Sequence, residues 1–150
     1  MSYFSIFNIE PIFEIELSKL ESEYFKAQRQ YHPDRFVGKP AEEKMAALQK
    51  SMDINKAYEV LKDPLKRAQH LLALQGITVG TEKDSVKPVN ELLMEVMELR
   101  ENPPAKAEIL KLVENSQNMV AKNYKNSKFP EMAQEVLRLG YLMKIWQSEK

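Results

Sequence analysis

Apolar residues recur at intervals of three and four along most of this chain, the spacing that places side chains on one face of an α-helix. In a first stretch, from about residue 16 to 31, these positions are Leu17, Leu20, Tyr24, Ala27 and Tyr31. In a second, from about residue 41 to 61, they are Ala47, Ser51, Ile54, Tyr58 and Leu61. We therefore predict two long amphipathic helices joined by a loop that begins at His32.

Other signals predict further helices. Asp63-Pro64 is typical of an N-cap followed by proline in the first turn, and Gly76 suits the position just beyond the end of that helix. Helical periodicity returns over about 90–101, 105–125 and 130 to near the C-terminus. The aromatic-rich residues 3–7 suit one brief helix. Because strand-like alternation is scarce, the predicted fold class is all-α.

A change in composition between residues 76 and 89 divides the chain. This stretch contains glycine, threonine, serine and proline with little periodicity, which is typical of a linker. We expect an N-terminal domain over residues 1–76, built from a helical hairpin plus short helices. A linker over 77–89 and a C-terminal three-helix bundle over 90–150 follow it, with antiparallel neighbours because the connections are short.

Composition and charge exclude several classes of function. The chain has 22 basic and 22 acidic residues, a balance that argues against nucleic-acid binding as its main role. It has no cysteine, so disulfides, thiolate metal ligands and cysteine nucleophiles are impossible. His32 and His70 lie far apart without ligand spacing, and we expect no metal site and no cofactor.

Hydropathy and cysteine usage suggest a location. No apolar run approaches the roughly 20 residues that cross a bilayer. The first ten residues lack the basic start and long apolar run of a secretory signal. The absence of cysteine fits a reducing compartment. We therefore expect a cytoplasmic protein that does not contact membranes.

The loop between the two long helices carries the most distinctive chemistry. In His32-Pro33-Asp34 the proline ring fixes one backbone angle, so the flanking side chains lose less entropy when they dock. Asp34 offers a carboxylate suited to a bidentate bond from a partner arginine. Basic residues that could steer encounter with an acidic surface are Lys19, Lys26, Arg29 and Arg35.

Two other interpretations fit the tripeptide alone. X-Pro-Asp turns are common, so it could be a surface turn beside a solvated charged face. His32 and Asp34 could also form the acid–base pair of a small hydrolase. They stand two residues apart around a rigid proline, without a nucleophile or oxyanion-hole motif, which argues against an enzyme.

A longer match favours a third interpretation. The chain closely resembles the J-domain family in two segments, YHPDR at 31–35 and INKAYEVLKDPLKRA at 54–68. The resemblance implies docking on an ATP-driven chaperone of the DnaK type, whose ATP hydrolysis it would stimulate by favouring one conformation. His32, Pro33 and Asp34 would contact the chaperone, with electrostatic contacts from Lys26, Arg29 and Arg35. The chain itself would perform no catalysis.

The predicted helix over 90–101 has apolar side chains on two nearly opposite faces. One face consists of Leu92, Val96 and Leu99, and the other of Leu93, Met94 and Met97, continued by Glu98 and Glu101. Both faces could pack against neighbouring helices. Alternatively, the second could be an exposed recognition surface, a role for which the adaptable methionine side chain is well suited.

The order of these features resembles the HscB family, the J-proteins specialised for iron–sulfur cluster assembly. The features are YFSIF at 3–7, the J-domain, LQG at 74–76, the linker, LMEVMELRE at 93–101 and a C-terminal bundle. The resemblance implies that the chain binds an IscU-type scaffold protein and delivers it to an HscA-type chaperone. The scaffold-binding positions would be Leu93, Met94, Met97, Glu98, Glu101 and Tyr141. Tyr141 could instead be a core aromatic, because it shares a helix face with Leu137 and Ile145.

The chain also departs from the family. The connection through Asn102-Pro103-Pro104 is shorter than usual, and the sequence ends soon after Trp146, which shortens the bundle. No cysteine motif precedes the J-domain, unlike in the eukaryotic relatives, and this favours a bacterial form. The alternative function is a J-domain interaction module for a different client, outside iron–sulfur assembly.

Overall fold

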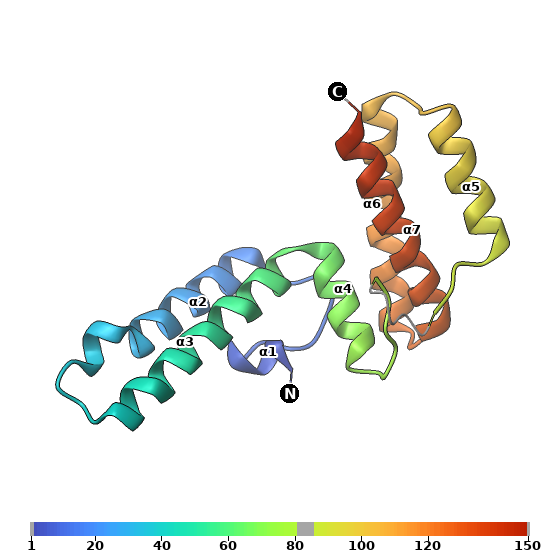
Figure 1. Ribbon diagram of the computed structural model, residues 1–150. Helices are drawn as coiled ribbons and strands as arrows, with labels where there is room; N and C mark the ends of the chain where they lie inside the picture. The colour runs from blue at the N-terminus through green and yellow to red at the C-terminus, as the bar shows by residue number, and fades with distance from the viewer. Residues whose placement is uncertain (1, 81–85, 150) are drawn as a thin grey trace. The chain divides into compact units, whose positions relative to one another are not determined.

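All regular elements of the described residues, 2–80 and 86–149 of this computed structural model, are helices (Figure 1). In chain order they are α1 (Tyr3–Ile6), α2 (Leu17–Tyr31), the 3₁₀ helix η1 (Pro33–Phe36), α3 (Ala41–Lys62), α4 (Pro64–Ala73), α5 (Asn90–Glu101), α6 (Lys106–Lys125) and α7 (Phe129–Ser148). The predicted all-α fold class is confirmed, and the helix ends lie within two residues of those expected from periodicity.

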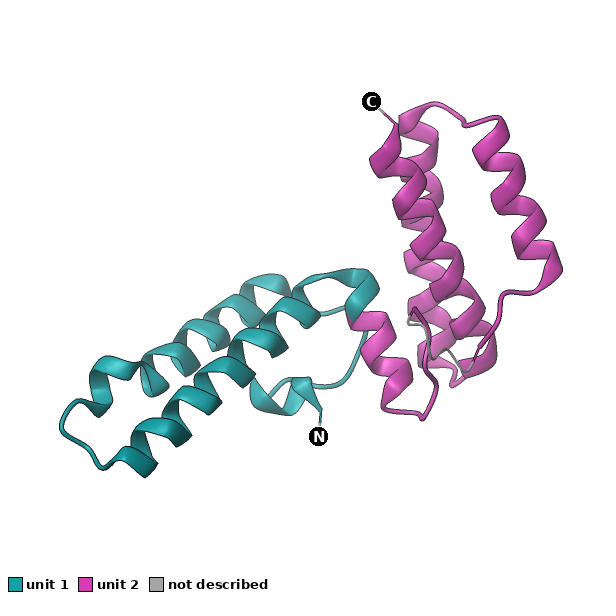
Figure 2. Ribbon diagram, viewed as in Figure 1, with its two compact units in different colours: residues 1–66 teal, residues 67–150 magenta. Residues whose placement is uncertain are grey.

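The chain forms two compact units, Met1–Lys66 and Arg67–Lys150 (Figure 2). The division falls inside α4, ahead of the domain end at residue 76 that composition suggested. The expected linker, 77–89, includes residues 81–85, which lie outside the described residues. The limits 1–76, 77–89 and 90–150 therefore stay a prediction.

The N-terminal unit is built on a hairpin of α2 and α3, and α1 packs against α3 (Figure 1). Its buried apolar side chains are Phe4, Phe7, Phe13, Leu20, Ala47, Ile54, Ala57 and Leu61. Each large member contributes roughly 1.5–3 kcal/mol through its removal from water. Leu17, expected on the same face as Leu20, is instead exposed at the first residue of α2.

An aromatic cluster joins the two arms of the hairpin. The rings of Tyr24 in α2 and Tyr58 in α3 stack 3.9 Å apart and almost parallel. Phe7 meets Tyr24 edge-on at 6.4 Å. Such pairs add about 0.5–1.5 kcal/mol beyond area burial, so the stack fixes the register of α2 against α3.

An N-cap residue and a glycine set the two ends of α4 as the sequence predicts. The carboxylate of Asp63 accepts a hydrogen bond from the backbone N–H of Leu65 at 2.9 Å, as an N-cap should. Gly76 has a φ of +79°, and the next residue, Ile77, donates its N–H to the carbonyl of Leu72. Glycine tolerates this left-handed conformation without strain, which explains its place after α4.

In the C-terminal unit, α7 packs against both α6 and α5 (Figure 1). The three helices bury Leu92, Val96, Ile109, Val113, Val120, Met132, Ala133, Val136, Leu139, Leu142 and Ile145. α7 supplies the largest share of this core because two of its faces meet a neighbour. The predicted set of three C-terminal helices is confirmed.

Candidate partner-binding surfaces

The tip of the N-terminal hairpin is a tight turn organised by His32. α2 ends at Tyr31 and η1 begins at Pro33, so His32 alone has an extended backbone between two helices. Its Nδ1 accepts a hydrogen bond from the N–H of Asp34 at 3.2 Å and so caps η1. The imidazole ring of His32 is therefore tied to the backbone of the turn through Nδ1.

The three tip side chains are exposed, and the side chain of Asp34 is more exposed than that of His32. The Asp34 side chain is 90% exposed and that of His32 is 58% exposed. The Asp34 Oδ2 lies 3.6 Å from His32 Nδ1, beyond hydrogen-bond reach. The carboxylate is therefore available to a donor on another molecule.

A shallow hollow of about 340 Å³ adjoins the tip. Its lining consists of Phe25, Gln28, Arg29, His32, Asp34 and Arg35. The structure thus brings two of the predicted basic residues beside the tripeptide. Lys26 is exposed on α2 outside the lining, where it meets Glu23 at 3.4 Å, and Lys19 borders a separate hollow.

Sequence reasoning missed two residues of this hollow, Phe25 and Gln28. Gln28 Nε2 donates to the hydroxyl of Tyr24 at 2.6 Å and to Oδ1 of Asn55 at 3.0 Å. The Tyr24 hydroxyl also donates to Asn55, at 2.9 Å. A polar triad therefore holds the wall of the hollow to α3. Phe25 lies off the apolar stripe of α2, and its spacing of four residues from Arg29 was the signal available in the sequence.

The chemistry of the hollow does not suit hydrolysis. Its lining contains no serine, threonine or cysteine that could act as a nucleophile. The Nδ1 of His32 is occupied by a backbone N–H, so Asp34 does not orient the ring as a catalytic carboxylate would. In the part of the chain that the structure describes, no three acidic or histidine side chains gather as metal ligands.

Helix α5 presents the second candidate surface. Leu92 and Val96 are buried, whereas Leu93, Met94 and Met97 are 39%, 70% and 60% exposed. Glu98 and Glu101 are exposed beside them. Of the two arrangements considered for this helix, the structure has one buried stripe and one open apolar face rimmed by carboxylates. We call Leu93, Met94, Met97, Glu98 and Glu101 the α5 face.

Tyr141 lies on α7 and is half-buried, so it is neither a core residue nor fully open. The guanidinium of Arg100, from α5, lies 5.7 Å from the centre of its ring. This cation–π contact ties the aromatic ring to the helix that carries the α5 face.

Within residues 2–80 and 86–149, none of the helices combines the length and the hydropathy that spanning a bilayer requires.

Comparison with known proteins identifies the family. The DnaJ domain family matches residues 2–70. Co-chaperone protein HscB of Proteus mirabilis is 43% identical over 101 residues, which cover 67% of this chain and 58% of that protein. The aligned region thus spans less than two thirds of this relative's length.

Solved structures extend the likeness to nearly the whole chain. Chaperone HscB from Vibrio cholerae has a TM-score of 0.83 at 28% identity, covering 98% of this chain and 94% of that one. Human co-chaperone protein HscB also has a TM-score of 0.83, at 27% identity, covering 98% of this chain and 79% of that one. The chain belongs to the HscB family of J-domain co-chaperones.

Proposed function

We propose that this chain is a bacterial cytoplasmic co-chaperone of iron–sulfur cluster assembly. It stimulates ATP hydrolysis by an HscA- or DnaK-type chaperone and delivers an IscU-type scaffold protein to it, without catalysis of its own. The observation that carries the proposal is the exposed His32-Pro33-Asp34 tip with Arg29 and Arg35 beside it. Membership of the HscB family supports the choice of partners.

The tip suits a role in which one rigid group fits one conformation of the chaperone. Pro33 and the His32 cap restrict the backbone, so little entropy is lost on docking. The exposed carboxylate of Asp34 accepts hydrogen bonds from a chaperone arginine, a charge-assisted contact that is stronger than a neutral one. By binding the hydrolysis-competent conformation more tightly than the other, the tip shifts the population toward it.

Basic residues on α2 and η1 guide the encounter. Arg29 and Arg35 flank the hollow, and Lys26 adds positive charge on the same helix as Arg29. An acidic chaperone surface would be attracted to them, and the attraction weakens as salt screens it. These three side chains therefore affect the rate of association more than the final fit.

The α5 face binds the scaffold. Leu93, Met94 and Met97 offer adaptable apolar area, and Glu98 and Glu101 place negative charge at its edge. A complementary scaffold surface is apolar with basic side chains at its rim. Tyr141 contributes from α7, where Arg100 covers its ring.

The test is a single-turnover ATPase assay of an HscA-type chaperone with the chain carrying Asp34→Asn. The substitution removes the charge of the carboxylate and keeps its shape. Losing a charge-assisted contact of this kind costs at least about 2 kcal/mol, or roughly thirtyfold in affinity, so stimulation should fall close to the basal rate at concentrations that half-saturate wild type.

The matched control is Asp53→Asn on α3, which makes the same chemical change at an exposed position that does not line the hollow. It should stimulate as wild type does. Circular dichroism checks that both variants stay helical. If Asp34→Asn stimulates fully, the tip does not have the proposed role.

A further inference from the structure

Helix α5 could bury either of two apolar stripes, and the structure buries only one. Leu92 and Val96 face α7, whereas Leu93 and Met97 are exposed. Side chains of leucine, valine and methionine gain similar free energy on burial, about 1.5–3 kcal/mol each. The hydrophobic effect alone therefore does not decide which stripe of α5 meets α7, and a polar contact must add to the choice.

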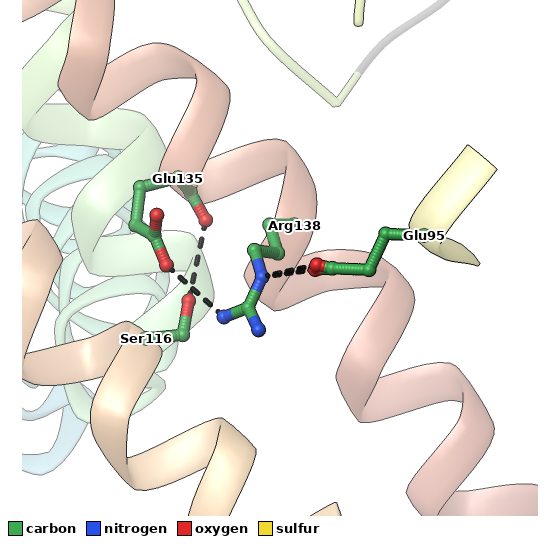
Figure 3. A network of polar contacts seen from close by, with 4 residues as sticks. All are labelled: Glu95, Ser116, Glu135 and Arg138. Carbon is green, nitrogen blue, oxygen red and sulfur yellow. Dashed lines mark hydrogen bonds and ion pairs between the residues drawn. The ribbon is translucent and has the colours of Figure 1, made fainter. Parts of the chain in front are cut away.

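The strongest polar contact of α5 is an ion pair with α7 (Figure 3). Arg138 Nε lies 2.6 Å and 3.0 Å from the two carboxylate oxygens of Glu95. Arg138 Nη1 donates to Glu135 at 3.3 Å, and Ser116 of α6 donates to the backbone carbonyl of Glu135 at 3.4 Å. The Arg138 side chain is only 22% exposed, so losing its partner would leave a partly desolvated charge.

Glu95 occupies a position on α5 that makes this pair selective. At about 100° per residue, Glu95 lies about 200° from Leu93 and about 200° from Met97. It therefore stands nearly opposite the exposed stripe and beside the buried one. If α5 rolled to bury Leu93 and Met97, Glu95 would turn to solvent and Arg138 would keep only Glu135.

Two more contacts from the same face of α7 hold α5 in place. Gln134, one turn before Arg138, donates to the carbonyl of Lys87 at 2.8 Å and accepts from the N–H of Val89 at 3.0 Å. Tyr141, one turn after, meets Arg100 on the other flank of the buried stripe. α5 is thus held at its start and on both sides, and Arg138 supplies the central contact.

We propose that Arg138 is a positioning residue that selects, through Glu95, which apolar stripe of α5 is buried. By doing so it keeps Leu93, Met94 and Met97 outward as a binding surface. The part of this inference that concerns scaffold binding rests on the proposed function. The selection itself is a property of the chain alone and is tested without a partner.

The test uses the absence of native cysteine in the chain. Single cysteines at Met94, which is exposed, and at Leu92, which is buried, report which stripe faces solvent through the rate of thiol labelling. In an otherwise wild-type chain Met94→Cys should react far faster than Leu92→Cys. With Arg138→Met the ratio of the two rates should fall about tenfold, as expected when a coupling near 1.4 kcal/mol is lost.

Controls separate positioning from general destabilisation. Arg138→Lys keeps a positive charge near Glu95 and should restore most of the ratio. Lys111→Met removes an exposed charge from α6 and should leave the ratio unchanged. Glu95→Gln removes the other half of the pair and should lower the ratio as Arg138→Met does. If Arg138→Met loses helicity, the labelling ratio of Glu95→Gln still tests the positioning role.

Scaffold titration gives a second readout. With Arg138→Met, the scaffold concentration at half-maximal ATPase stimulation should rise about tenfold, while the maximum at saturating scaffold stays at the wild-type value. Unchanged labelling ratios with Glu95→Gln would overturn the positioning role, whatever happens to binding. If the wild-type chain shows no response to the scaffold in this assay, the proposed function is contradicted. The labelling ratios would still decide the role of Arg138.

Discussion

Among single residues, His32 shapes the turn that presents Asp34. Its Nδ1 accepts a hydrogen bond from the backbone N–H of Asp34 and so shapes the turn. The turn presents the Asp34 carboxylate to solvent, and the carboxylate makes no hydrogen bond to His32. The tip thus offers an exposed carboxylate on a capped turn, which suits recognition by another protein better than catalysis.

His70 makes the stability of the chain depend on pH. Burial lowers the pKa of His70 below its usual value of 6.5. The unfolded chain therefore takes up this proton at a higher pH than the folded chain does. The stability that neutral His70 supports is full above about pH 6.5 and declines as the pH falls from there toward the lower pKa of the folded state.

We therefore expect urea unfolding midpoints to be lower at pH 5.5 than at pH 7.5 and the difference to shrink in His70→Gln. Glutamine cannot gain a proton in this range, so one source of the pH dependence disappears. Circular dichroism measures both midpoints. An undiminished pH difference in His70→Gln would show that other groups cause it.

Residue-scale features were predictable where the chemistry is local. The cap at Asp63 and the turn glycine at Gly76 follow from backbone rules that involve only neighbouring residues. The partners of Gln28 and Arg138 were not predictable, because Asn55 and Glu95 lie far away along the chain. Only the packing of helices brings such pairs together.

At the scale of helices, periodicity predicts where an element lies but not which of two apolar faces is buried. For α3 the pattern has one buried face, and Ile54 and Leu61 are fully buried as expected. For α5 the pattern allows two faces, and the outcome depends on α7. α3 also exposes three large apolar side chains that the periodicity did not single out, namely Met45, Leu48 and Met52.

The α5 face gives a direct prediction for scaffold binding. The double substitution Leu93→Ala and Met97→Ala removes apolar area from an exposed surface, so the helix content should not change. Interface anchors of this kind cost about 1–2 kcal/mol each when truncated to alanine. Isothermal titration with an IscU-type scaffold should show affinity at least about thirtyfold weaker.

A matched control is the double substitution Leu110→Ala and Met119→Ala on α6. These side chains are 42% and 43% exposed, and their loss removes a similar amount of apolar surface elsewhere in the same unit. The control should bind as tightly as wild type. If both double variants bind the scaffold equally weakly, or if the α5 variant binds it as tightly as wild type, the scaffold site does not lie on α5.

At the scale of the whole molecule, two compact units each present one candidate surface. The tip of the hairpin belongs to the first unit, and the α5 face belongs to the second. The proposed delivery of a client requires both surfaces on one chain, because covalent linkage makes the second binding event intramolecular and raises its effective concentration. Two separate proteins with one surface each would lack this gain.

Complementation between two variant chains shows whether both surfaces must lie on one chain. One chain carries Asp34→Asn, the other carries Leu93→Ala with Met97→Ala, and the readout is the scaffold-dependent rise in ATP hydrolysis by an HscA-type chaperone. We expect the mixture to do no better than either variant alone, while wild type at the same total concentration gives the full rise. A mixture that matches wild type would contradict delivery by a single two-surface chain.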